Sequence, residues 1–199
     1  MMKIQSQKQV WNKIAEEWFE FKKNPGRGVE DFLKKQKGKI LDLGSGSGRN
    51  LVKTKGKMYL VDFSEKMIKL AKEKAKKENI DAEFFVEDIT NLSFPDNFFD
   101  AAISIAALHC LDKKKQEKAV KELYRVLKPK APAKIAVWNK DSKRFKNSSK
   151  EKFISWRDKG KRYYYLFNEK EIHDLFKKAG FKIKKKIDSD VNIVFIAEK

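Results

Sequence analysis

A glycine-rich segment, residues 41–48, carries the strongest chemical signal in the sequence. Gly44, Gly46 and Gly48 follow an apolar run and precede a segment with helical character. Glycine lets the backbone turn tightly and approach a ligand where a Cβ would collide. The spacing is G-x-G-x-G, with Arg49 where a dinucleotide fingerprint has its third glycine, and the Gly-Lys-Ser/Thr of a phosphate loop is missing. The segment predicts a ligand-binding turn of another type or, more simply, a tight strand-to-helix turn.

Carboxylates follow the next two apolar runs. Asp62 lies 18 residues after Gly44, where a carboxylate can accept hydrogen bonds from a ribose diol. Phe63 beside it is placed to lie against a purine ring, and Asp88 after the third run is placed to receive an adenine amino group. The alternative for Asp62 is a helix-capping role next to Ser64. Together with Asp42, these residues predict a nucleoside site at the carboxyl ends of parallel strands.

The elements that must hold these residues alternate between strand-like and helix-like patterns. Such alternation predicts an α/β fold with a mostly parallel sheet whose faces are both covered by helices. The predicted buried strands are residues 39–43, 58–61, 83–86, 101–105 and 133–138. Residues 181–187 and 191–197 are predicted to form a C-terminal antiparallel hairpin, because only a tight connection separates them.

Helix signals fill the intervals between these strands. Ser64 and Asp112 are predicted N-caps, the first of a helix through Glu78, and Asn168 with Glu171 resembles a capping box before a helix that ends near Gly180. Apolar residues at helical spacing predict one more helix near the amino end, with Trp11 and Trp18 in the core rather than in a ligand lid: Val10, Trp11, Ile14, Ala15, Trp18 and Phe19.

The chain has 199 residues with 47 Lys and Arg against 28 Asp and Glu, a formal charge of +19. A polyanionic partner explains this excess through counterion release, and a generally Lys-rich and Glu-rich composition explains it equally well. Ten basic and three acidic residues lie between residues 139 and 162. We interpret this stretch as a long, partly mobile connection, which places part of the charge beside Arg162, Tyr163 and Tyr164.

Composition narrows the class of protein. The length predicts a single domain over residues 1–199, with an N-terminal helical segment 1–37 and the basic connection 139–162. No apolar run is long enough for a membrane span, and the basic start, residues 1–10, lacks the apolar stretch of a signal peptide. Cys110 is the only cysteine, so an intrachain disulfide is excluded and a zinc or other metal site is not expected. These features predict a cytoplasmic protein that does not bind a membrane.

Three further motifs carry a family resemblance: residues 103–109 (ISIAALH), 122–129 (ELYRVLKP) and 135–138 (IAVW). With the glycine loop, they make the chain resemble the class I S-adenosylmethionine-dependent methyltransferases over nearly its whole length. It is most similar to the tRNA wobble-uridine carboxymethyl methyltransferases, whose flanking motifs resemble residues 10–15 and 162–167. The chain departs from that family at Cys110 and Tyr165, where histidines are usual, at residues 130–132, where glycines are usual, and at residues 24–28, where Pro-Trp-Pro is usual.

The resemblance implies a Rossmann-like, doubly wound, seven-stranded mostly parallel sheet with strand order 3-2-1-4-5-7-6. It implies methylation of the carboxylate of a 5-carboxymethyl group on a wobble uridine, with S-adenosylmethionine converted to S-adenosylhomocysteine. It also implies a tRNA substrate and a small zinc-binding activator protein as partner. The implied cofactor-binding residues are Asp42, Gly44, Ser45, Gly46, Gly48, Asp62, Phe63, Asp88, Ile89, Ser104 and Ile105.

The implied catalytic residues are His109, Arg162 and Tyr164. A carboxylate oxygen is already nucleophilic, so in-line displacement at the sulfonium methyl needs positioning and exclusion of water more than a base. Arg162 is expected to grip a substrate carboxylate or phosphate, while His109 and Tyr164 orient the nucleophile. His109 instead becomes a candidate base for a nitrogen or hydroxyl acceptor, or is a structural histidine of the core.

Strand 83–86 (Glu83 to Val86) falls at an edge of the implied sheet. An edge strand with Phe84 and Phe85 offers unpaired backbone and apolar surface, and we expect the activator protein to add a strand there unless a helix or loop covers it. Two other functions fit the same sequence: methylation of a small carboxylate or other metabolite, and RNA binding without catalysis.

Overall fold

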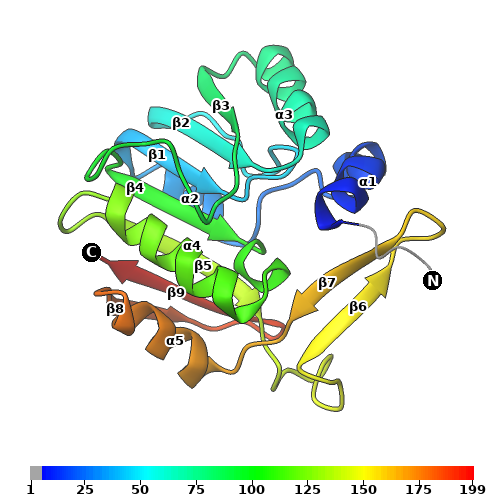
Figure 1. The fold of residues 1–199 in the computed structure, drawn as a ribbon. Helices are drawn as coiled ribbons and strands as arrows, with labels where there is room; N and C mark the ends of the chain where they lie inside the picture. Colours follow the sequence, from blue (N-terminus) through cyan, green and yellow to red (C-terminus); the bar gives the residue numbers. More distant parts are fainter. Residues whose placement is uncertain (1–5) are drawn as a thin grey trace.

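The structure, a computed structural model, describes residues 6–199; residues 1–5 of the predicted N-terminal segment lie outside it. Within the described residues, seven strands form one sheet of order β3-β2-β1-β4-β5-β9-β8 (Figure 1). Strands β1 to β5 pair in parallel, and β9 runs antiparallel to both β5 and β8. The sheet therefore has the predicted strand order, its last two strands being the predicted C-terminal hairpin.

The strands are β1 Lys37–Leu43, β2 Lys55–Asp62, β3 Ala82–Val86, β4 Ala101–Ile105, β5 Pro132–Trp138, β6 Glu151–Ser155, β7 Lys161–Tyr165, β8 Lys182–Ile187 and β9 Asn192–Glu198. The helices are α1 Gln7–Phe21, α2 Val29–Leu33, α3 Glu65–Glu78, α4 Lys113–Val126 and α5 Glu169–Lys178, with a 3₁₀ turn at Leu108–Cys110. Each of the five predicted parallel strands lies inside an observed strand.

Helices cover both faces of the seven-stranded sheet. Neighbouring strand residues point to opposite faces, so Ile40 and Leu41 of β1 belong to different cores. Leu41 packs in the core that includes α4 and α5, and Ile40 packs with α2 and α3 (Figure 1). Burial on both faces explains why the central strands are continuous apolar runs rather than alternating ones.

The predicted helix caps are confirmed. The side chains of Ser64, Asp112 and Asn168 accept hydrogen bonds from the third backbone N–H after them, at 3.2, 3.0 and 3.0 Å. These bonds satisfy N–H groups that the first helical turn leaves without a partner. Gly180, with φ +107°, directly follows α5, where a Cβ would lie 2.7 Å from the ring of Tyr124.

The prediction of a mobile connection over residues 139–162 is wrong. Residues 151–155 form β6, which pairs antiparallel with β7 as a two-stranded sheet beside the main sheet (Figure 1). Arg157 and Gly160, with φ +48° and +122°, shape the turn between them. The dense lysines hid the strand, because only Phe153 and Ile154 of β6 are apolar and they are adjacent rather than alternating.

Strand β3 forms an edge of the sheet, as predicted. The expected apolar surface differs, because Phe84 and Phe85 are only half-exposed and pack on the two cores. The ring centroid of Phe85 lies 4.8 Å from that of Phe94. Val86, at 44% exposure, is the residue of β3 that leaves an apolar side chain in solvent.

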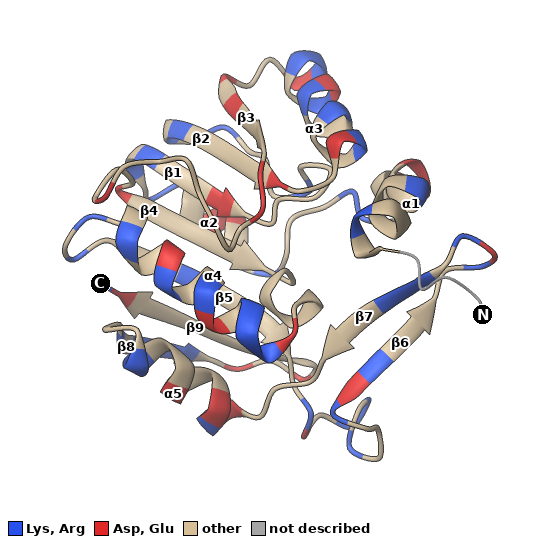
Figure 2. Cartoon of the chain, in the orientation of Figure 1, with Lys and Arg blue, Asp and Glu red and all other residues tan. Residues whose placement is uncertain are grey.

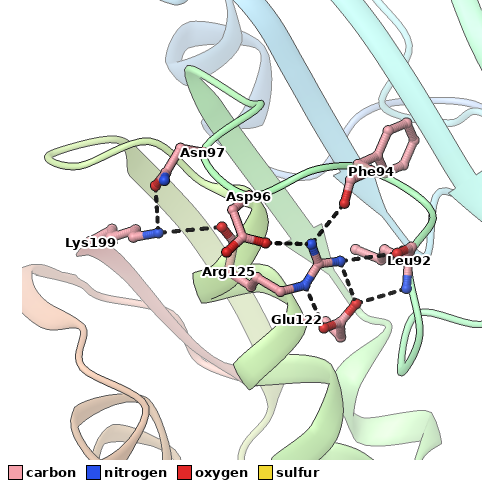
Figure 3. A network of polar contacts seen from close by, with 7 residues as sticks. All are labelled: Leu92, Phe94, Asp96, Asn97, Glu122, Arg125 and Lys199. Carbon is pink, nitrogen blue, oxygen red and sulfur yellow. Dashed lines mark hydrogen bonds and ion pairs between the residues drawn. The ribbon is translucent and has the colours of Figure 1, made fainter.

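Arg125 of α4 clamps the loop that follows β3 (Figure 3). Its guanidinium donates to the backbone oxygens of Leu92 and Phe94, at 3.0 and 2.8 Å, and to both carboxylate oxygens of Glu122, at 2.8 Å each. Glu122 in turn accepts from the backbone N–H of Leu92 at 2.8 Å. The E-x-x-R of the sequence motif 122–129 therefore serves to hold this loop against α4.

We predict that Arg125→Met lowers the free energy of unfolding by about 2–3 kcal/mol, because it removes several charge-assisted hydrogen bonds and leaves carbonyls without donors. Urea denaturation measures the change. Lys118→Met, on the exposed side of the same helix, is the matched control and is expected to stay within about 0.5 kcal/mol of the parent chain. Equal stability of the two variants would contradict the clamp.

Candidate functional site

The glycine loop after β1 adopts a left-handed backbone at each of its three glycines. Gly44, Gly46 and Gly48 have φ of +76°, +55° and +77°. A Cβ at Gly44 would lie 2.3 Å from the Cβ of Ala107, whereas a Cβ at Gly46 would meet no atom within 4 Å. Gly44 is thus required by packing of the loop, and Gly46 leaves open space where a ligand can approach the backbone.

Asp62 at the end of β2 ties the glycine loop to helix α3. Its Oδ2 accepts from the backbone N–H of Gly46 and its Oδ1 from that of Ser64, both at 2.9 Å. Burial raises the pKa of the Asp62 carboxyl to about 6. Each carboxylate oxygen also keeps a lone pair for a further donor such as a hydroxyl, so these backbone contacts leave the predicted ligand contact open to Asp62.

Asp42 lies behind the glycine loop as a fully buried carboxyl. Neither of its oxygens has a hydrogen-bond partner within the described residues. Burial, and secondarily the nearby charge of Asp62, raises the pKa of Asp42 to about 7. The charge of Arg49 opposes this shift, which places the guanidinium near the carboxyl.

A cavity of about 480 Å³ opens over these strand ends. Eight of the residues predicted to bind a cofactor line it: Gly44, Ser45, Gly46, Asp62, Phe63, Asp88, Ile89 and Ile105. Asp42, Gly48 and Ser104 do not. Gly48 packs beside Ala71 of α3, and the Ser104 hydroxyl donates to the carbonyl of Leu43 at 3.2 Å, so both support the wall from behind.

Asp88 is held in place by its own loop. Its Oδ1 accepts from the backbone N–H and the hydroxyl of Thr90, at 2.9 and 2.8 Å. Asp62 and Val86 are paired residues of β2 and β3, so Asp88 follows the strand end directly beside Asp62. The structure therefore brings together the glycine loop, Asp62 and Asp88 at three adjacent strand ends, as the sequence predicted.

The three predicted catalytic residues gather in one buried cluster. The Arg162 Nη1 donates to the Tyr164 hydroxyl at 2.6 Å, and the rings of His109 and Tyr164 lie 5.6 Å apart. None of the three lines the cavity, and each is at most 6% exposed. Their immediate neighbours Cys110 and Tyr163 do line it.

His109 is neutral in this environment. Burial lowers the pKa of its imidazole to about 3, and its Nδ1 accepts from the backbone N–H of Trp138 at 3.0 Å. The proton of a neutral imidazole must then lie on Nε2. In this tautomer His109 can donate a hydrogen bond and has no free nitrogen to accept a proton.

Arg162 lies in a cage of aromatic rings. Its guanidinium carbon is 4.8 Å from the ring centre of Trp156, 5.4 Å from Trp18, 5.8 Å from Trp11 and 5.3 Å from Tyr164. Rings at these distances stabilise a buried cation through their quadrupoles. The Nε has no hydrogen-bond partner within residues 6–199, so the rings carry much of the stabilisation.

Several wall residues were not predicted. Trp11 and Trp18 pack with α3 but also line the cavity, so assigning them to the core alone was wrong. Arg49 lines it as well, and its Nε is buried without a partner. The position of Arg49 at the end of the glycine loop could have indicated that it lines the site. In the sequence, Arg49 served only as evidence that a dinucleotide fingerprint lacks its third glycine. Cys110 lines the cavity with a thiol whose pKa burial raises to about 12.

Comparison with known families identifies the fold of this site. Residues 40–130, just under half of the chain, match the family model described as "Methyltransferase domain". This segment of the chain is therefore similar to methyltransferase domains. The match begins in β1 and ends before β5, and so includes the glycine loop and the ends of β2 and β3.

Curated relatives match part of the chain. A tRNA (carboxymethyluridine(34)-5-O)-methyltransferase of Arabidopsis thaliana is 39% identical over 101 residues, covering 50% of this chain and 24% of the relative. The ubiquinone/menaquinone biosynthesis C-methyltransferase UbiE of Cronobacter sakazakii is 37% identical over 100 residues, covering 46% and 39%. The chain therefore spans well under half the length of the relatives it matches.

Solved structures share the whole fold. A Burkholderia thailandensis 1,6-didemethyltoxoflavin-N1-methyltransferase with bound S-adenosylhomocysteine has a TM-score of 0.75 at 16% identity, covering 96% of this chain and 86% of that one. A putative methyltransferase in complex with the Haloferax volcanii Trm112 activator has a TM-score of 0.72 at 17% identity, covering 94% and 93%. The chain thus has the class I S-adenosylmethionine-dependent methyltransferase fold.

Among residues 6–199, no group of three or more His, Cys, Asp or Glu side chains is arranged to hold a metal ion. No helix in this part of the chain is long and apolar enough to cross a membrane.

We predict that Asp42→Asn flattens the pH dependence of folding stability between about pH 4 and pH 7. The native pKa of Asp42, about 7, lies above the ordinary 3.8, so over this window the native state holds a proton that the unfolded state has released. The free energy of unfolding must therefore fall as pH rises, and the uncharged amide removes this contribution.

Urea denaturation at several pH values measures this effect. Asp158→Asn, in the exposed turn of the β6–β7 hairpin, is the matched control and is expected to keep the parental pH profile. A profile of Asp42→Asn that parallels that of the parent chain would show that the carboxyl is not protonated in the fold.

Proposed function

We propose that the chain transfers a methyl group from S-adenosylmethionine to the carboxylate of a 5-carboxymethyl-type wobble uridine in tRNA. The observation that carries the proposal is the cavity wall built from three adjacent strand ends, with open space at Gly46 and the carboxylates of Asp62 and Asp88. The acceptor is supported by the 39% identity over 101 residues to the Arabidopsis carboxymethyluridine methyltransferase.

The wall fits the cofactor in charge as well as in shape. Asp62 offers lone pairs for ribose hydroxyls, Asp88 and Ile89 a polar edge and an apolar face for adenine, and Gly46 a backbone approach. Arg49 supplies a cation with an orphaned Nε, and we assign it to the carboxylate of the methionine part. When bound, S-adenosylmethionine supplies an activated methyl group on a sulfonium.

The chain's own contribution is to orient the acceptor and to exclude water. A carboxylate acceptor needs no base, and the neutral His109, whose Nδ1 is already occupied, offers none. None of the three predicted catalytic residues lines the cavity, so we propose His109, Tyr164 and Arg162 as positioning residues. In their places behind Cys110 and Tyr163, they would act by fixing the wall that the acceptor touches.

Basic residues surround the hairpin next to the cavity. Figure 2 shows Lys and Arg on β6, β7 and the loop before them. Lys143, Lys146 and Lys161 are exposed and form no salt bridge within the described residues. Such free cations on the hairpin and on the loop before it favour a phosphate backbone as ligand. The polyanion that we infer is tRNA.

We also infer that a small zinc-binding activator protein adds a strand to β3. Support comes from the edge position of β3, from exposed Val86, and from the Haloferax neighbour of the same fold, which was solved with a methyltransferase activator. Backbone pairing gives affinity in strand addition, while side chains at the edge give specificity.

A second candidate is methylation of a small ring metabolite. The UbiE relatives, at 37% identity over 100 residues, favour this alternative because the same wall would serve both acceptors. It requires no affinity for RNA, so the two candidates differ in the acceptor that takes up the methyl group.

The deciding experiment uses labelled S-adenosylmethionine and bulk tRNA pretreated with mild alkali, which hydrolyses existing methyl esters and regenerates the acceptor carboxylate. We expect label to enter this tRNA, with or without the activator, and to leave again on a second mild alkaline treatment. Label that enters only small quinols, or tRNA label that resists alkali, would contradict the proposed acceptor.

Gly46→Ala tests the cofactor site in the same assay. Its Cβ has free space in the fold, so we expect the chain to fold while S-adenosylmethionine binds at least tenfold more weakly. Gly44→Ala is the contrasting variant, because its Cβ meets Ala107 and is expected to lower stability. Unchanged cofactor affinity of Gly46→Ala in calorimetry would place the cofactor elsewhere.

Val86→Lys tests the activator edge. A lysine on an edge strand opposes strand addition by adding a charge that pairing would bury. We expect the variant to lose co-purification with a coexpressed zinc-binding activator and to keep cofactor binding. Phe21→Lys is the control, because Phe21 is 62% exposed on α1 and should retain the activator. Retention by Val86→Lys would contradict docking at β3.

A further inference from the structure

The cavity has a second wall that the class I sheet does not supply. It is formed by the first turn of α1, the loop after β4 and the β6–β7 hairpin, through Gln7, Cys110, Asp112, Phe153 and Tyr163. These segments lie far apart in sequence and meet on the side of α1 that faces the hairpin (Figure 1). Opposite the glycine loop, this wall is where an acceptor must lie if the cofactor occupies the strand ends.

Phe153 is an exception among the aromatic residues of this wall. It is 59% exposed although it lines the cavity. It stands directly opposite Tyr163 in the β6–β7 register, with ring centroids 5.5 Å apart at 65°. The hairpin thus presents a large apolar face to the opening of the cavity rather than to the core.

The partner ring, Tyr163, is held in place. Its backbone N–H donates to the Gln7 Oε1 at 2.9 Å, and the Gln7 Nε2 donates to the carbonyl of Lys161 at 3.1 Å. The side chain of Gln7 therefore bridges α1 and β7 on both sides of Arg162. Because this part of β7 is already held in place, little conformational entropy is lost there when a ligand binds. This favours a rigid, flat ligand.

We propose that Phe153, backed by Tyr163, is the stacking surface for the acceptor base, a pyrimidine ring that carries an anionic substituent. This inference rests on the proposed function and adds the residue that holds the base. A base has apolar faces and polar edges, and the same cavity offers the ring of Phe153 together with the side chains of Gln7, Asp112 and Lys115. Lys115 adds a cation, and the flanking hairpin lysines suit the neighbouring phosphates.

A lipid-tailed ring would need a different wall. Its tail would have to leave the ring along a continuous apolar path, whereas the segments around Phe153 carry Lys152, Lys159 and Lys161. Stacking on an exposed aromatic residue beside a basic strand is instead the usual arrangement for a base that is turned out of a nucleic acid. We therefore commit to a nucleobase rather than a quinol as the occupant.

Three variants test the stacking surface: Phe153→Ala, Phe153→Trp and the matched control Phe21→Ala, which truncates an equally exposed aromatic residue outside this cavity. The probe is radiolabelled 5-carboxymethyluridine nucleoside in equilibrium dialysis, with S-adenosylhomocysteine saturating. Thermal melting checks that each variant is folded. We expect Phe153→Ala to weaken nucleoside binding about tenfold. Phe153→Trp and Phe21→Ala are expected to bind like the parent chain.

The binding readout separates this inference from the proposed function. If the parent chain binds the nucleoside, Phe153→Ala does not, and no methyl reaches tRNA, the stacking surface stands and only the proposed reaction fails. Equal binding by Phe153→Ala and the parent chain overturns the inference. Failure of the parent chain to bind the nucleoside also overturns it, as does displacement of the nucleoside by a prenylated quinol that binds Phe153→Ala equally well.

Discussion

The carboxylate of Asp62 is the interaction on which the site depends. It holds the backbone N–H of Gly46 on one side and that of Ser64 on the other, so β2, the glycine loop and the first turn of α3 are fixed by one side chain. Burying this carboxyl is unfavourable, as its raised pKa indicates. A second buried carboxyl, Asp42, adds to that cost. In return for this desolvation cost, the carboxylate oxygens of Asp62 are hydrogen-bond acceptors whose orientation is fixed before a ligand binds.

The cavity wall formed by α1 and the β6–β7 hairpin is held together by a different kind of interaction. Where the strand ends rely on backbone hydrogen bonds, α1 and the hairpin are joined by long-range side-chain contacts. The Trp156 indole N–H donates to Glu17 of α1 at 2.6 Å, and Lys159 pairs with the same carboxylate at 2.6 Å. The cation of Arg162 lies among the rings that these contacts bring together. The strand ends thus form one part of the cavity wall through backbone hydrogen bonds, and the joined α1 and hairpin form another through side-chain contacts.

Prediction from the sequence succeeded where the signal is local. Apolar runs gave the five parallel strands, and the caps at Ser64, Asp112 and Asn168 depend on a side chain and an N–H three residues away. It failed for β6, because the partner of this strand lies across a turn and its two apolar residues are adjacent rather than alternating. It also failed for Trp11 and Trp18, since helical spacing shows that they share a face but not that this face borders a cavity.

The catalytic predictions show the same limit most clearly. The sequence predicts Arg162 and Tyr164 as catalytic residues but predicts no strand over residues 161–165, where the structure has β7. Side chains alternate between faces along a strand, so Arg162 and Tyr164 share one face of β7 and Tyr163 takes the other. Only Tyr163 of the three lines the cavity, and the pairing of β6 with β7 sets Phe153 opposite it. When residues 161–165 are assigned to a strand, the alternation of side chains along it puts Tyr163 rather than Arg162 on the cavity side. The expected contact with the acceptor therefore belongs to Tyr163 and to Phe153, its partner in β6.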